Sequence, residues 1–487
     1  MTSIFERSIQ STAWNIGASL TGAVVLFGRS VLLSRWLPVA TFGVYAKAMA
    51  VIALAAVLLS FGLNAAMLHR SPETQNEAHA AATHFTLTTI FTAVWLVIVL
   101  TGSYLFTKGN LRWALMVIAI ATGLNNLTQT SRSILLRRII HRRLALIQFI
   151  TIFATTGIAL FLAWRGVSLG ALLATNVTTA LIALFLHYLW RPVWRPQWRW
   201  QGPEIRYFLS FGSRTFLSSA LIIALNKLDD LWTGAYLGDT ALGFYGRAYT
   251  FATYPSRVLA TPVNNVSGGT YAELKYERQQ LSQAFFRTLA LLIRTGFLLG
   301  GWLAFVAPEF VGLLLGNKWL PIITVFRLML VFTLLDPIKG TIANLFIAVG
   351  KPESIIQVRL IQLVILVMGL FLFGTRWGII GVAFAVDIML FMGILLLLWK
   401  SRRYVTLSIR KAFLVPTLAL SGAFLAGYGT LRILGMSEAT WGSAMLKTAI
   451  FLLIYLLVLF LGEREQVAGM MKMLHTSLTR RKASAAQ

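Results

Sequence analysis

The stretch NKLDDLWTGAYLGDTALGFYGRAYT, residues 226–250, combines charge inside an apolar segment with one copy of an internal repeat. Its first part carries Lys227, Asp229 and Asp230 among mostly apolar residues. Its second part, LGDTALGFYGRA at 237–248, is similar to LPVATFGVYAKA at 37–48. Ionised groups are costly to bury in apolar surroundings, so the three charged residues are candidates for a functional site.

The composition of the chain indicates a membrane protein. Of its 487 residues 57% are hydrophobic and only 12% are charged, and the mean hydropathy is +0.74. Soluble domains carry about 25% charged residues. Apolar runs of about 20 residues, each long enough to cross a bilayer as a helix, recur along the chain. The chain has no cysteine, which excludes disulfides and cysteine-based metal sites. We therefore expect an all-α polytopic membrane protein.

Hydropathy predicts fourteen membrane-spanning helices, with boundaries good to a few residues. The expected spans are 13–36, 42–68, 82–107, 112–136, 144–164, 167–190, 208–236, 242–268, 283–306, 320–348, 354–374, 377–399, 412–433 and 440–461.

Basic residues gather in the links that follow even-numbered spans. Three such clusters lie at 137–143, 190–200 and 400–411, whereas links after odd-numbered spans are short and nearly neutral. Because basic loops stay in the cytoplasm, this pattern places both termini there. Much of the net charge of +27 is thus a topology signal rather than a sign of nucleic-acid binding.

The repeat has a constant offset of 200 residues. Leu37, Gly43, Tyr45 and Ala48 match Leu237, Gly243, Tyr245 and Ala248, with Lys47 matching Arg247 conservatively. A second similarity joins WRGVSLGALLA at 164–174 to RWGIIGVAFAV at 376–386. We infer two six-helix lobes related by a pseudo-twofold axis along the membrane normal, a plan used by secondary transporters.

The duplication predicts the domain organisation. We expect an N-lobe at 1–190, a basic, Trp-rich cytoplasmic linker at 191–206 and a C-lobe at 207–400. Two peripheral helices at 401–462 and a basic cytoplasmic tail at 463–487 follow. The linker is either a collar that attracts anionic lipid head groups or an interfacial anchor.

Charges inside expected spans favour a polar central cavity, although for any one residue an interhelical salt bridge explains the charge equally well. Adjacent residues of a helix point about 100° apart, so Asp229 and Asp230 face different directions. Arg29 occupies the position equivalent to Asp229, so we expect the two to face each other across the cavity. The amides Asn126 and Gln129 suit sugar hydroxyls but also join helices. The further intramembrane charges are Arg257, Arg294, Arg327, Asp336, Lys339 and Asp387.

The stretch from Leu225 to Ala248, LNKLDDLWTGAYLGDTALGFYGRA, resembles the hallmark of Wzx-type flippases for lipid-linked oligosaccharides. These belong to the multidrug/oligosaccharidyl-lipid/polysaccharide exporter superfamily, and the similarity is to exporters of colanic acid and related exopolysaccharides. RSVLLSRWLPVATFGVYA at 29–46 and AVGKPE at 348–353 support it.

The resemblance implies a transporter, without a cofactor, in a bacterial cytoplasmic membrane. It moves an undecaprenyl-pyrophosphate-linked oligosaccharide from the cytoplasmic to the periplasmic leaflet by alternating access. Membrane lipids and the polysaccharide polymerase and export machinery are the implied partners, and nucleic acid is not one. The implied cargo-binding residues are Arg29, Asn126, Gln129, Lys227, Arg257 and Arg294. The implied residues for gating or for coupling to a proton or sodium gradient are Asp229, Asp230, Asp336, Lys339 and Asp387.

Three alternatives stay open. A lipid II flippase shares the expected architecture and a cationic cavity. A cation-coupled multidrug antiporter is disfavoured by Arg29, since such exporters are expected to line the cavity with acids. A membrane glycosyl polymerase or ligase is disfavoured because it is expected to carry a large external loop, and no expected external link exceeds about a dozen residues.

Overall fold

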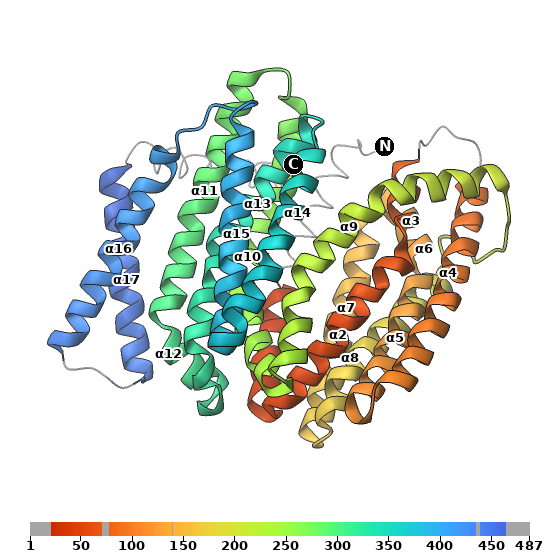
Figure 1. Ribbon diagram of the computed structural model, residues 1–487, viewed down its shortest axis with the longest axis horizontal. Helices are drawn as coiled ribbons and strands as arrows, with labels where there is room; N and C mark the ends of the chain where they lie inside the picture. Colours follow the sequence, from red (N-terminus) through yellow and green to blue (C-terminus); the bar gives the residue numbers. More distant parts are fainter. Residues whose placement is uncertain (1–20, 71–76, 139, 435–438, 464–487) are drawn as a thin grey trace, which may run out of the picture. The chain divides into compact units, whose positions relative to one another are not determined.

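A computed structural model describes residues 21–70, 77–138, 140–434 and 439–463, and every regular element in these ranges is a helix (Figure 1). Residues 21–36 form the first described helix. The others are α2 Val39–Ser60, α3 Leu63–His69, α4 Glu77–Phe106, α5 Gly109–Leu127, α6 Gln129–Arg137, α7 His141–Trp164, α8 Ser168–Leu184, η1 Phe185–Leu189, α9 Gly202–Tyr236, α10 Asp239–Glu273, α11 Arg278–Phe305, α12 Ala307–Glu309, η2 Phe310–Leu315, η3 Asn317–Ile322, α13 Ile323–Ala348, α14 Glu353–Gly369, η4 Leu370–Gly374, α15 Thr375–Ser401, α16 Ile409–Ile433 and α17 Trp441–Gly462.

The polytopic helical fold is confirmed. Ten helical stretches among the described residues are long and apolar enough to cross a membrane. One of them, 353–401, contains both α14 and α15, and a non-helical kink lies at Gly378. Each expected span from the second to the fourteenth coincides with a described helix or pair of helices. Of the first expected span, the part before residue 21 lies outside the described residues.

Two expected spans are interrupted rather than continuous. The span expected at 42–68 breaks between α2 and α3, where Phe61 and Gly62 have positive φ angles of 35° and 70°. Glycine adopts this left-handed conformation without steric cost. The span expected at 112–136 breaks at Thr128, whose hydroxyl donates to the Asn125 carbonyl at 2.7 Å. The amide of Thr128 donates to the same carbonyl at 3.2 Å, which is the tighter i→i−3 pattern of a 3₁₀ turn.

The described helices form two compact units. Unit 1 comprises Met1–Thr250 and Ile356–Met389, and unit 2 comprises Phe251–Ile355 and Leu390–Gln487. This division passes through α10 and α15. The lobe boundaries inferred from the duplication remain a prediction.

Unit 1 has a core between α2, α4, α5 and α8. Trp95 of α4 is buried there, and its indole N–H donates to the carbonyl of Ala55 on α2 at 2.9 Å. Satisfying the indole in this way is required where no water is available. A second apolar cluster joins α3, α4 and α6 to α9 around the fully buried Phe208. The second cluster fixes the course of α9, which carries the charged residues.

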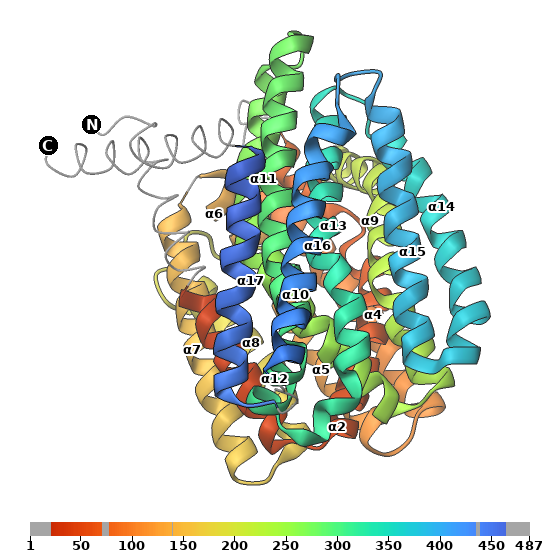
Figure 2. The same cartoon turned by 90° about the vertical axis from the view of Figure 1, so that its left-hand side faces the viewer.

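Unit 2 is organised around α11, which contacts α13, α16 and α17. Figure 2 shows α11, α16 and α17 side by side. Phe305 of α11 lies in an aromatic group with Phe424 of α16 and Phe451 of α17, at centroid distances of 5.6 and 6.0 Å. The two helices expected at the periphery therefore pack against α11 within unit 2.

Candidate functional site

The repeated segments meet each other at the starts of two helices in unit 1. α2 begins at Val39 and α10 at Asp239, which are equivalent positions 200 residues apart. A Cβ atom on Gly43 would overlap the main-chain carbonyl of Asp239, and one on Gly243 would overlap the carbonyl of Val39. The contact is therefore reciprocal, as in a twofold-symmetric interface, and it requires glycine on both sides.

Asp229 is held by the second repeat. Its Oδ2 accepts a hydrogen bond from the hydroxyl of Tyr245 at 2.5 Å, and both residues are buried. Oδ1 of Asp229 is also buried and has no hydrogen-bond partner among the described residues. This carboxylate therefore has one anchored oxygen and one oxygen that can accept a proton or a cation.

Asp230 has a different partner, as the helical geometry predicts. Its Oδ2 lies 2.8 Å from Nζ of Lys227, one turn earlier on α9. The Lys227 side chain is 32% exposed, whereas that of Asp230 is 11% exposed. Two adjacent carboxylates thus face different neighbours, one on α10 and one on α9.

Lys47 and Arg247, the conservative pair of the repeat, reach in equivalent directions. Lys47 of α2 donates to the carbonyl of Gly234 on α9 at 3.0 Å and lies 3.7 Å from Oδ1 of Asp239. Arg247 of α10 donates to the hydroxyl of Ser30 in the helix at 21–36 at 2.9 Å. Each repeat therefore sends one cation to the helix that precedes the other repeat.

Arg247 also lies over an aromatic ring. Its guanidinium carbon is 3.8 Å from the centroid of Phe42, in α2. A guanidinium over a ring gains cation–π energy and keeps its planar face oriented. We call Lys47, Lys227, Asp229, Asp230, Tyr245 and Arg247 the α9–α10 cluster.

Arg29, the cargo-binding candidate of the first span, lies in the same unit. Its guanidinium donates to the hydroxyl of Thr155 on α7 at 3.4 Å, and the residue is half-buried. Asp229, its equivalent in the repeat, bonds instead to α10. The predicted encounter of the two across a cavity remains a prediction.

The remaining candidates of unit 1 have separate surroundings. Asn126 is buried and donates to the hydroxyl of Thr92 on α4 at 3.0 Å, which joins α5 to α4. Gln129 is half-buried and begins α6. Oδ1 of Asp387 in α15 is buried without a hydrogen-bond partner in the described part of the chain.

Unit 2 contains the other four candidates. Arg257 is exposed on α10, between the prolines Pro255 and Pro262. Asp336 and Lys339 form an ion pair of 2.7 Å on α13. Arg294 of α11 is buried and lies 2.6 Å from Glu463, which directly follows α17. Arg294 therefore forms a salt bridge with a buried carboxylate. This is the explanation that the sequence analysis gave as the alternative to a charge lining a cavity.

The α9–α10 cluster lies within a region that the chain shares with a known protein family. A model of the polysaccharide biosynthesis protein family matches residues 32–324. The chain belongs to this family. Two curated relatives are similar over most of their length. The lipopolysaccharide biosynthesis protein WzxC of Escherichia coli K12 is 24% identical over 403 residues, 78% of each chain. An uncharacterised membrane protein in the cps region of Klebsiella pneumoniae is 24% identical over 394 residues, 77% of this chain and 78% of the relative.

A solved structure shows the same fold. The lipid II flippase MurJ in an inward closed conformation aligns with a TM-score of 0.75 at 16% identity, covering 94% of this chain and 100% of that one. At this identity the similarity concerns the fold alone. The polysaccharide biosynthesis family and the helical membrane fold are therefore both shown.

Three members of the α9–α10 cluster were missed as site residues by sequence reasoning. Lys47, Tyr245 and Arg247 were assigned to the repeat but not to a site. The offset of 200 residues was the available signal, because it paired Lys47 with Arg247.

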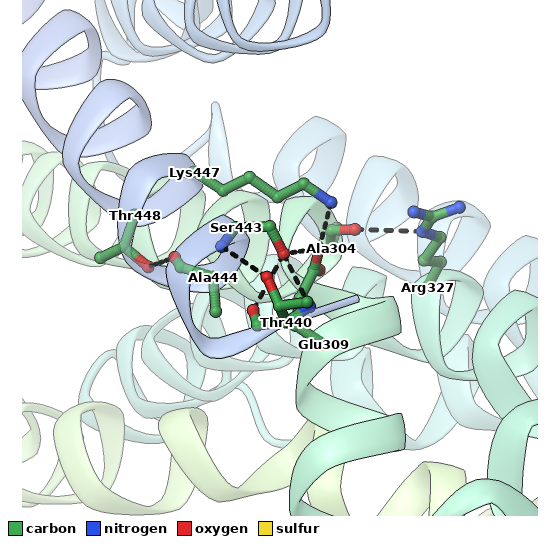
Figure 3. Close-up of polar contacts among 8 residues, drawn as sticks. All are labelled: Ala304, Glu309, Arg327, Thr440, Ser443, Ala444, Lys447 and Thr448. Atoms are coloured by element: carbon green, nitrogen blue, oxygen red, sulfur yellow. Dashed lines mark hydrogen bonds and ion pairs between the residues drawn. The ribbon is translucent and has the colours of Figure 1, made fainter. Parts of the chain in front are cut away.

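A second missed group lies at the start of α17 (Figure 3). Glu309 is 2% exposed, and its Oε1 pairs with Nζ of Lys447 and accepts from Ser443 Oγ at 3.2 Å. Thr440 and Ser443 cap α17 through reciprocal hydrogen bonds of 3.1 and 2.9 Å. With the Arg294–Glu463 pair at its other end, α17 is attached to α11 and α12 by two buried ion pairs.

Proposed function

We propose that this protein transports an undecaprenyl-pyrophosphate-linked oligosaccharide from the cytoplasmic to the periplasmic leaflet of a bacterial cytoplasmic membrane. The observation that carries the proposal is the α9–α10 cluster inside the matched region of a polysaccharide biosynthesis family. Intramembrane charges of this kind mark transport pathways. A transporter of an anionic lipid needs cations along its pathway to receive the charged head group.

The cations of unit 1 are chemically suited to a pyrophosphate. Arg29 and Arg247 both hydrogen-bond to hydroxyl groups, and Arg247 keeps a fixed plane over Phe42. A planar guanidinium binds phosphate oxygens in a bidentate manner, which a lysine cannot do. We therefore assign pyrophosphate binding to Arg29 and Arg247, with Lys227 as a further cation of the pathway.

We assign the coupling of transport to a proton or sodium gradient to carboxylates of unit 1. Asp229 and Asp387 each have a buried oxygen without a hydrogen-bond partner among the described residues, so a proton or a sodium ion can occupy it. Binding there drives transport only if the affinity differs between the inward- and outward-facing states. The basic loops support cytoplasmic termini, and the polymerase and export machinery are the proposed partners.

Purified protein in proteoliposomes tests this function directly. A fluorescent undecaprenyl-pyrophosphate-linked oligosaccharide is placed in one leaflet, and its transfer is followed by quenching with a membrane-impermeant reagent. Transfer that depends on the protein and accelerates with a proton or sodium gradient is expected. Turnover of the sugar itself, as new glycosidic bonds or released carrier, would instead identify a glycosyl polymerase or ligase.

Lipid II transport is a second candidate because the fold aligns with MurJ over the whole length of that structure. The two functions differ only in the head group of the cargo. Competition between unlabelled lipid II and the labelled oligosaccharide in the same proteoliposomes separates them. Stronger competition by lipid II than by the oligosaccharide would favour the second candidate.

A further inference from the structure

The first turns of α9 form the wall of a hollow with a volume of about 360 Å³. In Figure 1 these turns lie beside α3, at the end of unit 1 that the basic loops assign to the cytoplasm. The volume falls in the range of small-molecule sites, about 300–1,000 Å³. The lining residues are Pro203, Arg206, Tyr207, Ser210, Phe211 and Arg214.

The lining carries two positive charges and no negative one. Arg206, Ser210 and Arg214 are spaced four residues apart, so their side chains lie on one face of α9. Both arginines are exposed, and neither has a hydrogen bond or ion pair with another residue of the described ranges. The nearby acid Glu204 is already paired with Arg70, at 2.7 Å between Oε1 and Nη2. The hollow is therefore suited to an anion.

The apolar side of the hollow is fixed by contacts between α9 and α3. The hydroxyl of Tyr207 donates to the carbonyl of Ala66 on α3 at 3.4 Å, and the ring of Phe211 lies 4.7 Å from that of His69. The intervening Phe208 is fully buried. These contacts fix the backbone of α9 and the apolar side of the hollow, next to which the two exposed arginines project.

The residues that precede the hollow indicate its position at a membrane surface. Trp198 and Trp200 in the linker are each 68% exposed. The linker itself is ordered by a hydrogen bond of 2.9 Å from the Arg199 amide to the hydroxyl of Thr86. Exposed tryptophans beside a membrane helix are typical of the head-group level. An anion that reaches this hollow is therefore expected to be part of a lipid.

We propose that this hollow binds the phosphate of a membrane lipid, with Arg206 and Arg214 contacting the phosphate oxygens and Ser210 donating its hydroxyl. Guanidinium groups provide the strongest hydrogen bonds to phosphate, and Tyr207 and Phe211 accept the glycerol or prenyl carbons that follow. The phosphate has two sources, an anionic phospholipid of the bilayer or the pyrophosphate of the polyprenyl carrier. The second source rests on the proposed function.

Native mass spectrometry of the purified full chain tests the site. The protein in detergent is titrated with phosphatidylglycerol, with undecaprenyl pyrophosphate and with diacylglycerol, which lacks phosphate. We expect at least one phosphate lipid to bind more tightly than diacylglycerol, and the Arg206→Gln/Arg214→Gln variant to weaken that lipid about tenfold or more. The lipid whose affinity falls identifies the source of the phosphate.

Two further variants separate a defined site from general attraction to positive charge. Ser210→Trp fills the hollow and keeps both arginines, so it is expected to weaken the same lipid. Arg402→Gln/Arg403→Gln removes two exposed arginines in unit 2 and is expected to leave the affinity unchanged. Equal affinity of wild type and the Arg206/Arg214 variant for both phosphate lipids would overturn the proposal, as would equal losses in the Arg402/Arg403 variant. The phospholipid titration does not depend on transport, so failure of the proposed function leaves this test decisive.

Discussion

Gly43 lies against the main-chain carbonyl of Asp239, and the same contact recurs 200 residues away, between Gly243 and the carbonyl of Val39. The first residue of each helix, Val39 of α2 or Asp239 of α10, therefore packs against a glycine of the other helix. The residues that follow, Lys47 and Arg247, then reach the helices on either side. The close approach of the repeats is what positions the α9–α10 cluster.

Gly43→Ala and Gly243→Ala are expected to destabilise unit 1. A methyl group at either position overlaps a main-chain carbonyl, so the backbones of α2 and α10 must separate. Overpacking of this kind typically costs about 1–3 kcal/mol. Thermal unfolding of the purified variants in detergent measures the effect as a fall in midpoint temperature.

Gly157→Ala is the matched control for the glycine variants. Gly157 lies inside α7, and nothing is within 4 Å of an added Cβ atom. Alanine is the better helix former, by about 0.5–1 kcal/mol, so this variant is expected to be as stable as wild type or slightly more stable. Equal midpoints for all three variants would show that the reciprocal contact has no energetic role.

Tyr245→Phe is expected to destabilise the protein because it removes the hydrogen bond to buried Asp229. Leaving a buried acceptor unsatisfied costs about 1–3 kcal/mol. Asp229→Asn removes the charge of the carboxylate that accepts this bond. The double variant Tyr245→Phe/Asp229→Asn is therefore expected to lose less stability than the sum of the losses of the two single variants. Additive losses in a double-mutant cycle would contradict a direct interaction. Tyr45→Phe, at the equivalent position of the first repeat, is the control. It also removes a tyrosine hydroxyl, but that hydroxyl bonds to Asn176 and not to a carboxylate.

Arg29→Ala is expected to abolish polysaccharide export while membrane abundance stays near normal. The residue is half-buried beside α7, so its loss removes a cation of the proposed pathway without opening the core. Surface polysaccharide and immunoblots of membrane fractions are measured together in cells that carry only the variant. Export at the wild-type level would make Arg29 a structural charge.

Glu309→Gln and Lys447→Met are expected to loosen α17 strongly when made singly. Each leaves a buried charge without its partner, at a cost of about 3–5 kcal/mol, and the double variant is expected to recover much of that loss. The pair Glu77–Arg138 serves as the comparison, because its side chains are 32% and 48% exposed. Breaking that pair is expected to cost about 0–1 kcal/mol. Similar losses of stability on breaking either pair would contradict a stabilising role of the buried Glu309–Lys447 pair for α17.

Much of the fold was predictable because the signals are local or periodic. Apolar runs located the helices, and the constant offset of 200 residues identified the two segments that form the reciprocal contact. The breaks at Phe61–Gly62 and Thr128 were not predicted. A single glycine or threonine in a membrane helix does not distinguish a break from a continuous helix, and only tertiary contacts decide between them.

The partners of the charges were much less predictable. Sequence indicated that Asp229 and Asp230 diverge, but it could not select Tyr245 as the donor, which lies sixteen positions further along the chain. Arg294 was assigned to the cargo, yet it lies against Glu463, a residue 169 positions away in the linear sequence. Pairings across such separations depend on how the helices are arranged, which composition and spacing do not encode.

The distribution of lipid-linked oligosaccharide between the leaflets, in cells that lack this protein, tests the central claim most directly. The account predicts that an undecaprenyl-pyrophosphate-linked oligosaccharide accumulates in the cytoplasmic leaflet, that surface polysaccharide is lost, and that the wild-type gene restores both. A normal distribution between the leaflets, together with increased sensitivity to cationic compounds, would contradict the account and indicate a drug antiporter.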